Sequence, residues 1–209
     1  MKKIKIKTSK EEIRDLAKAW IAISIAFGIA FSIDNYGSVF NAPFQKFIEN
    51  LLISGIAVGF GFLLHELAHK IVAQRYGCWA EFRSWDIMLL AAIAISFTGF
   101  IFAAPGAVFI SGLVGIPRNG RISVAGPIIN LVLAVFFFIL LIASSNNLVI
   151  TIAKYGISVN TWLAIFNMLP FGPLDGKKVF LWNKTVYFAV FGAAILFMFG
   201  FPILEVILG

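Results

Sequence analysis

A strongly apolar stretch of this sequence contains two histidines and a glutamate within five positions, His65, Glu66 and His69. Residues four apart project from one face of a helix, so the two imidazoles can bind a single metal ion. Neutral imidazoles suit zinc, which lowers the pKa of a bound water to about 7. Glu66 would lie within reach of that water, take its proton and later pass it to a leaving amine. The three residues therefore indicate hydrolytic zinc chemistry.

The apolar setting of these residues strengthens that interpretation. Ionisable side chains within a membrane span are costly and mark functional sites by default, and His65 and His69 are the only two histidines in the chain. A competing interpretation places a helix end at the membrane surface, where Glu66 and the histidines face lipid headgroups beside Lys70. The cost of burying all three side chains favours the metal site.

The third zinc ligand has to be a carboxylate or Cys78, because catalytic zinc usually has three protein ligands and the chain has no third histidine. A lone cysteine is more often a small buried hydrophobe. Of the acidic candidates, Glu81 and Asp86 fit solvated loop charges, whereas Asp175 ends a turn rich in proline and glycine, residues 167–176. Such a turn either aims Asp175 back into a helix bundle or is an ordinary exit turn that faces the cytoplasm.

The composition is that of a polytopic membrane protein. Of the 209 residues, 60% are hydrophobic and 13% charged, whereas soluble domains are about a quarter charged. Part of the formal net charge of +7 comes from basic residues before the first apolar run, which fits a positive-inside anchor better than a nucleic-acid surface. We therefore expect the lipid bilayer, and no nucleic acid, as a partner. The basic residues are Lys2, Lys3, Lys5, Lys7, Lys10, Arg14 and Lys18.

The apolar stretches predict an all-α polytopic membrane protein with five to six transmembrane helices, since a helix needs about 20 apolar residues to cross the bilayer. Without an internal repeat or a change in composition, we expect one integral-membrane domain over residues 1–209. Its catalytic core would span about residues 47–180, and we expect no soluble regulatory domain. The stretches are 17–33, 47–73, 87–116, 122–143, 148–169 and 185–208.

The third stretch, residues 87–116, decides the topology because it either crosses the membrane or returns to the side from which it entered. A full crossing would place the basic residues that follow it outside the cell, against the positive-inside bias. A re-entrant path keeps them with the basic N-terminus in the cytoplasm and leaves only Lys46 and Lys154 outside. We prefer this path, with five spanning helices, a turn at Thr98-Gly99 and an extended return over residues 105–110. The expected location is the cell membrane, with a cytoplasmic N-terminus.

Three motifs occur in a fixed order along the chain. They are H-E-x-x-H at residues 65–69, G-P-x-x-N at residues 126–130 and N-x-x-P-x-x-P-L-D-G at residues 167–176. Together they resemble the site-two protease family of intramembrane zinc metalloproteases. The matched region runs from Phe62 to Gly176, more than half of the chain, and the combination is specific although each motif alone is not.

The resemblance implies an enzyme, a zinc metalloendopeptidase that hydrolyses peptide bonds in or near transmembrane segments of membrane-protein substrates, as in regulated intramembrane proteolysis. It implies one zinc ion bound by His65, His69 and Asp175, with Glu66 as the catalytic acid and base. The family's zinc lies within the membrane near the cytosolic face. That position agrees with the charge distribution of this chain.

The resemblance also implies how substrate is held. Asn167 and Asn130 would line the cleft and bind substrate backbone or the oxyanion. A small re-entrant β segment near the cytosolic face, represented here by Gly106, Ala107 and Val108, would pair with an extended substrate. The alternative is a non-proteolytic membrane carrier or metal-handling protein that uses the same histidines. A carrier would show inverted repeats and paired broken helices, and the sequence contains neither.

Overall fold

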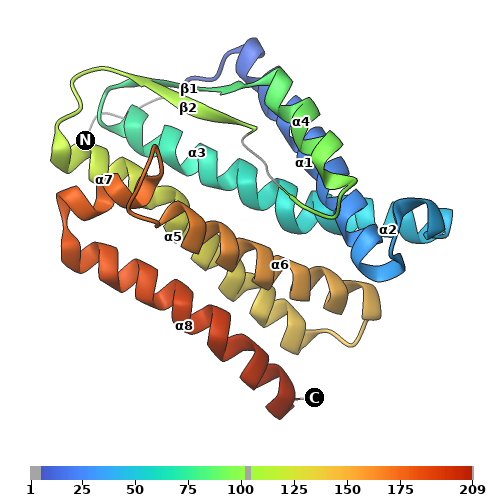
Figure 1. Ribbon diagram of the computed structural model, residues 1–209. Helices are drawn as coiled ribbons and strands as arrows, with labels where there is room; N and C mark the ends of the chain where they lie inside the picture. Colours follow the sequence, from blue (N-terminus) through green and yellow to red (C-terminus); the bar gives the residue numbers. More distant parts are fainter. Residues whose placement is uncertain (1–5, 102–104, 209) are drawn as a thin grey trace.

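A computed structural model describes residues 6–101 and 105–208 (Figure 1). Within these residues, five helical segments are long and apolar enough to cross a membrane, in agreement with the expected multi-pass membrane protein. A small two-stranded sheet completes the fold. The five segments are Lys10–Tyr36, Phe44–Arg75, Ile116–Ala143, Asn147–Asn167 and Lys184–Pro202.

Helix α1 (Lys10–Tyr36) begins earlier than the first apolar run, so several residues of the basic cluster are helical. Ser9 is its N-cap, and the Ser9 hydroxyl oxygen accepts a hydrogen bond from the Glu12 amide at 3.1 Å. Gly37, with φ of 73°, ends the helix in the left-handed conformation that glycine readily adopts. The 3-10 turn η1 (Val39–Asn41) then leads into the second membrane segment.

The second membrane segment consists of α2 (Phe44–Ser54), the π-helical turn η2 (Gly55–Gly59) and α3 (Phe60–Arg75). Single π turns inside α-helices often accompany functional sites, because they alter the backbone hydrogen bonding locally. In this turn, the carbonyl oxygen of Ala57 accepts a hydrogen bond from Nδ2 of Asn160 at 3.0 Å. Helix α3 carries the histidines and the glutamate.

The segment between α3 and α5 enters the protein and returns on the same side, as the charge distribution predicts. Strand β1 (Trp79–Ser84) pairs antiparallel with β2 (Gly106–Ser111). Between them, α4 (Asp86–Ser96) has 11 residues, which give a length of about 16 Å and are too few to cross the bilayer. The Trp85 amide, just before α4, donates a hydrogen bond to the Pro105 carbonyl, just before β2, at 3.0 Å. The chain therefore returns after α4 to the place where it left β1.

The predicted turn and return segment are both present. Gly99 has φ of 79° in the turn that follows α4, and residues 106–111 form β2. Residues 102–104 of the third apolar stretch lie outside the described residues. The strand β1, which pairs with β2, was not predicted.

Helices α5 (Ile116–Ala143) and α6 (Asn147–Asn167) form an antiparallel pair that packs beside α3 (Figure 1). They approach closely at Gly156 of α6, where a Cβ atom would lie 2.4 Å from the ring of Phe137 in α5. The short helix α7 (Asp175–Trp182), which the sequence analysis does not predict, precedes the last long helix α8 (Lys184–Leu208). Helix α7 and the start of α8 lie at the same end of the bundle as the end of α3 (Figure 1).

Candidate metal centre

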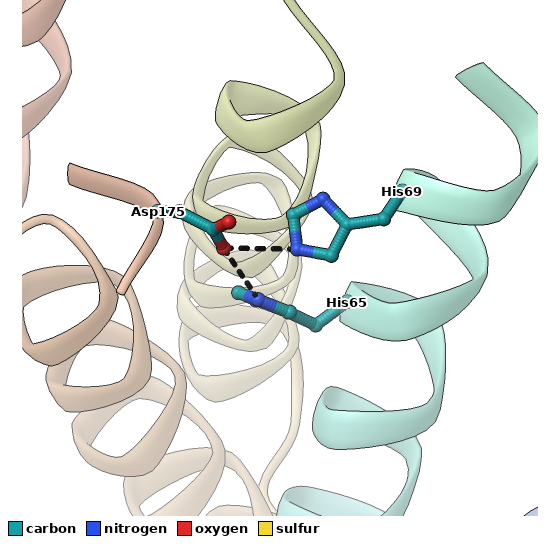
Figure 2. A group of neighbouring side chains, drawn as sticks. All are labelled: His65, His69 and Asp175. Atoms are coloured by element: carbon teal, nitrogen blue, oxygen red, sulfur yellow. Dashed lines mark ion pairs between the residues drawn. The ribbon is translucent and has the colours of Figure 1, made fainter. Parts of the chain in front are cut away.

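The three metal-binding residues expected from the sequence come together between α3 and α7 (Figure 2). Oδ2 of Asp175 lies 2.9 Å from Nε2 of His69 and 3.4 Å from Nε2 of His65. The exposed fractions of His65, His69 and Asp175 are 4%, 7% and 8%. Their candidate ligand atoms all lie within 4.8 Å of one another. The cluster is therefore buried and converges on one point, as a site for a single ion requires.

The turn before α7 brings the Asp175 carboxylate to α3, so the exit-turn interpretation is wrong. Gly176 lies against the end of α6, where a Cβ atom would be 2.1 Å from the carbonyl oxygen of Met168. Burial by itself raises the pKa of Asp175, but the charge of a protonated His69 and hydrogen bonds from the imidazoles hold that pKa well below its usual value. The site therefore stabilises an ionised carboxylate, the form that binds a metal.

A second contact orients each imidazole. Nδ1 of His65 lies 2.5 Å from Oδ1 of Asn130, and Nδ1 of His69 lies 2.8 Å from the carbonyl oxygen of Ile122. Both partners are acceptors, so each Nδ1 carries a proton and each Nε2 faces Asp175, where its lone pair would bind a metal ion in place of the proton that hydrogen-bonds to the carboxylate. Two neutral imidazoles and a carboxylate with one open position are the donor set of a catalytic zinc site. The residues present therefore fit zinc.

Asn130 lies behind His65 and supports the imidazole, which differs from the substrate-binding role expected for it. Its side chain is 0% exposed, and its Nδ2 donates to the Gly61 carbonyl at 3.2 Å and to Oδ1 of Asn160 at 3.0 Å. Asn160 in turn bonds to the carbonyl of Ala57 in the π turn. This chain of amides joins α3, α5 and α6 behind the site. Sequence reasoning missed Asn160, although a polar amide in an apolar helix is a signal.

Gly126 of α5 allows the two histidines to face the same point. A Cβ atom at this position would lie 2.5 Å from Nε2 of His65 and 2.5 Å from Nε2 of His69. The glycine of the G-P-x-x-N motif is thus explained by a close approach of α5 to the imidazoles. Pro127 follows it and removes one amide donor from the helix.

Glu66 contacts the outer edge of β2, where its Oε2 accepts a hydrogen bond from the Val108 amide at 3.1 Å. Val108 opposes Phe82 of β1. The amides of both residues donate to side chains outside the sheet, that of Val108 to Glu66 and that of Phe82 to Glu12. The two residues are therefore a non-hydrogen-bonded pair, and the backbone groups of Val108 point away from β1. Because strands alternate with period two, Gly106 shares this outer edge while the backbone of Ala107 faces β1.

The other candidates make their contacts with residues outside the metal cluster. Asn167 is half-buried at the end of α6, where its Nδ2 donates to a carbonyl of its own helix. Cys78 is buried among apolar side chains. Asp86 is exposed and binds Lys18 at 2.7 Å, and this hydrogen bond lowers the pKa of Asp86. Glu81 is not a solvated loop charge, since it lies in β1 and is 9% exposed.

Comparison with known proteins gives relatives that are named for the same chemistry. The chain is 40% identical over 182 residues to "Putative zinc metalloprotease MJ0611" of Methanocaldococcus jannaschii, a match that covers 86% of this chain and 88% of that protein. It is 33% identical over 130 residues to "Putative zinc metalloprotease Rip3" of Mycobacterium tuberculosis, which covers 58% of this chain and 29% of Rip3. It is 29% identical over 147 residues to "Putative zinc metalloprotease YwhC" of Bacillus subtilis.

The extent of these matches differs. The chain spans most of the archaeal relative, 63% of YwhC and less than a third of Rip3. No family model and no solved structure matches the chain.

Proposed function

Because this chain belongs to the site-two protease family of zinc metalloproteases, we propose that it hydrolyses peptide bonds in or near the transmembrane segments of other membrane proteins, as in regulated intramembrane proteolysis. The observation that carries this proposal is the burial of His65, His69 and Asp175 among apolar helices that can span a membrane. A protease whose metal ligands lie there meets its substrates within or beside the bilayer. Its partners are therefore transmembrane proteins and lipid.

The charge distribution supports a zinc site near the cytosolic face of the cell membrane. Exposed basic residues lie at the end of α3, at the starts of α5 and α8, and on α7, the helix that begins with the metal-binding residue Asp175. Basic residues favour the cytoplasmic side, so this end of the bundle faces the cytosol and the C-terminal end of α8 faces the opposite side. The residues are Arg75, Arg118, Arg121, Lys177 and Lys184.

A substrate segment has to become extended before it is cut, because a peptide bond inside a membrane helix is shielded and hydrogen-bonded. The outer edge of β2 offers a place for such a segment, by addition of a strand. The Val108 amide on this edge donates to Glu66 in the structure. A substrate carbonyl that takes over this hydrogen bond would release the Glu66 carboxylate. Arrival of substrate would in this way free the catalytic base.

Glu66 then acts as the general base and acid. It removes a proton from the attacking water and delivers it to the nitrogen that leaves the scissile bond. A bound zinc supplies the Lewis acidity that polarises the scissile carbonyl and acidifies the water. His65, His69 and Asp175 would hold that ion, and the contacts at the two Nδ1 atoms keep the imidazoles in the binding tautomer. Asn167 is the remaining candidate for a contact to substrate backbone.

The test is cleavage of single-span substrates by the purified chain in detergent or lipid vesicles, with product masses to locate the scissile bond. We expect cuts in or next to the apolar segment. Glu66→Gln should retain zinc and lose at least about 100-fold in rate. Glu49→Gln is the matched control, because Glu49 pairs with Lys46 on α2 at a distance from the site. Cleavage confined to remote soluble loops, or full activity of Glu66→Gln, would refute the proposal.

A further inference from the structure

Lys70 and Glu12 form an ion pair from which water is excluded. Their side chains are 1% and 0% exposed, and Nζ of Lys70 lies 2.5 Å from Oε2 of Glu12. Nζ also donates to Oγ1 of Thr8 at 2.8 Å. Burying two charges carries a desolvation cost that apolar residues of similar volume avoid, so stability alone does not account for such a pair.

The position of the pair connects it to the catalytic helix. Lys70 directly follows the metal ligand His69 and lies four residues after Glu66. Phe62, Glu66 and Lys70 are spaced at i, i+4 and i+8, so they share one face of α3. This face lies under the sheet, where the ring of Phe62 packs against the ring of Phe82 with centroids 5.8 Å apart.

The second oxygen of Glu12 holds the sheet. Oε1 of Glu12 accepts a hydrogen bond from the Phe82 amide at 3.0 Å. Phe82 opposes Val108 across the two strands, and the Val108 amide donates to Glu66. The contacts therefore connect two residues of α3 through the sheet and α1. Glu66 contacts Val108, Val108 pairs with Phe82, and Phe82 contacts Glu12, which binds Lys70.

Helix α1 thereby covers the outer edge of β1. In addition to the contact from Glu12, Oδ2 of Asp15 accepts a hydrogen bond from the Ser84 amide at 3.4 Å. Gln74 of α3 donates to the Ala80 carbonyl on the same edge at 2.9 Å. With this edge occupied, the sheet presents its other edge, that of β2, beside Glu66.

We propose that Glu12 and Lys70 are positioning residues for the proposed protease, which set the placement of β2 over Glu66 and so the point at which an extended substrate meets the catalytic carboxylate. The inference rests on the proposed function. A shift of the sheet would change the separation of Val108 from Glu66 without a change in the metal ligands. A misplacement of about 1 Å can lower a rate by about 100-fold.

Two double variants test this proposal because they differ only in the acceptor offered to the Phe82 amide. Glu12→Gln with Lys70→Met removes both charges and keeps a carbonyl oxygen for that amide. Glu12→Leu with Lys70→Met removes both charges and the acceptor. Neither leaves a buried unpaired charge, and both should bind one zinc per chain. The single variant Glu12→Asp, which shortens the side chain and keeps the charge, serves as a further variant if a double variant fails to fold.

The first measurement is kcat on a single-span substrate. We expect the variant with glutamine to stay within about threefold of the wild type and the variant with leucine to fall at least about tenfold at unchanged zinc content. The second is amide hydrogen exchange of residues 106–111, which should accelerate in the leucine variant and not in the glutamine variant. Glu12→Asp should lower kcat and accelerate this exchange.

Equal kcat and equal exchange in the two double variants would overturn the positioning role and leave the pair a purely structural one. If the wild type cuts no test substrate, the proposed function fails, and the exchange comparison still decides whether Glu12 positions β2. The two failures are therefore distinguishable.

Discussion

Replacing Gly126 by alanine is expected to prevent zinc binding, although alanine favours the helical conformation of α5 more than glycine does. Inside a helix, alanine is more favourable than glycine by about 1 kcal/mol. The added Cβ, however, would lie 2.5 Å from Nε2 of both His65 and His69. Carbon and nitrogen atoms in ordinary contact are about 3.5 Å apart, so each ring has to withdraw by about 1 Å. Zinc–nitrogen distances tolerate changes of only about 0.2 Å.

The magnitude follows from the number of ligands that move. Loss of one contact behind a metal ligand typically lowers affinity by about 10- to 100-fold. Here the methyl group displaces two ligands directly, so we expect zinc to bind at least about 100-fold more weakly, or about 2.7 kcal/mol less favourably. The conflict is with the ends of two side chains and leaves the backbone in place. The variant should therefore fold.

The assay is zinc content by mass spectrometry of the purified chain, with affinity from competition against a chromophoric chelator. Gly192→Ala is the matched control, because Gly192 lies in a membrane-spanning helix and a Cβ there meets nothing within 4 Å. We expect this control to bind zinc as the wild type does. A Gly126→Ala protein that holds one zinc with wild-type affinity would refute the inference that the ion lies between the two imidazoles.

Three further predictions concern the support of the site and the path of the chain. Asn130→Ala should weaken zinc binding by about 10- to 100-fold, as measured by chelator competition, because His65 loses the partner of its Nδ1. Asn160→Ala should destabilise the fold by about 1–3 kcal/mol in thermal or denaturant unfolding, since it leaves buried polar groups unpaired, with a smaller effect on zinc. A variant with cysteines in place of Ala80 and Ile110, and with the native Cys78 removed, should form a disulfide on mild oxidation, because these two residues are directly opposed across the strands. Two free thiols after oxidation would contradict the re-entrant path.

The metal-binding helix could be predicted because its chemistry depends on local spacing. His65 and His69 are four positions apart, and a helix in an apolar span puts both on one face. Asp175 could not be assigned from its turn, since prolines and glycines fit an exit turn equally well. What decides its direction is the contact of Gly176 with the end of α6, which requires the tertiary fold.

The membrane spans and the re-entrant path could also be predicted, from hydropathy and from the distribution of basic residues. The strand β1 could not, because Trp79–Ser84 is short, contains Glu81 and Arg83, and owes its burial to α1 and α3. The pair of Glu12 and Lys70 is 58 residues apart in sequence, so no local pattern reveals it. For Asn130, the resemblance indicates importance, whereas only the fold shows that its side chain faces His65.

The most direct test of a zinc protease built on His65, His69 and Asp175 is a titration of activity against bound zinc. Zinc is removed from the purified chain with a chelator and returned in steps, and the cleavage rate of a single-span substrate is measured at each step. We predict no cleavage without zinc and a rate that rises in proportion to zinc and saturates at one ion per chain. Cleavage that persists in the zinc-free chain, or zinc that binds without restoring it, would contradict this account.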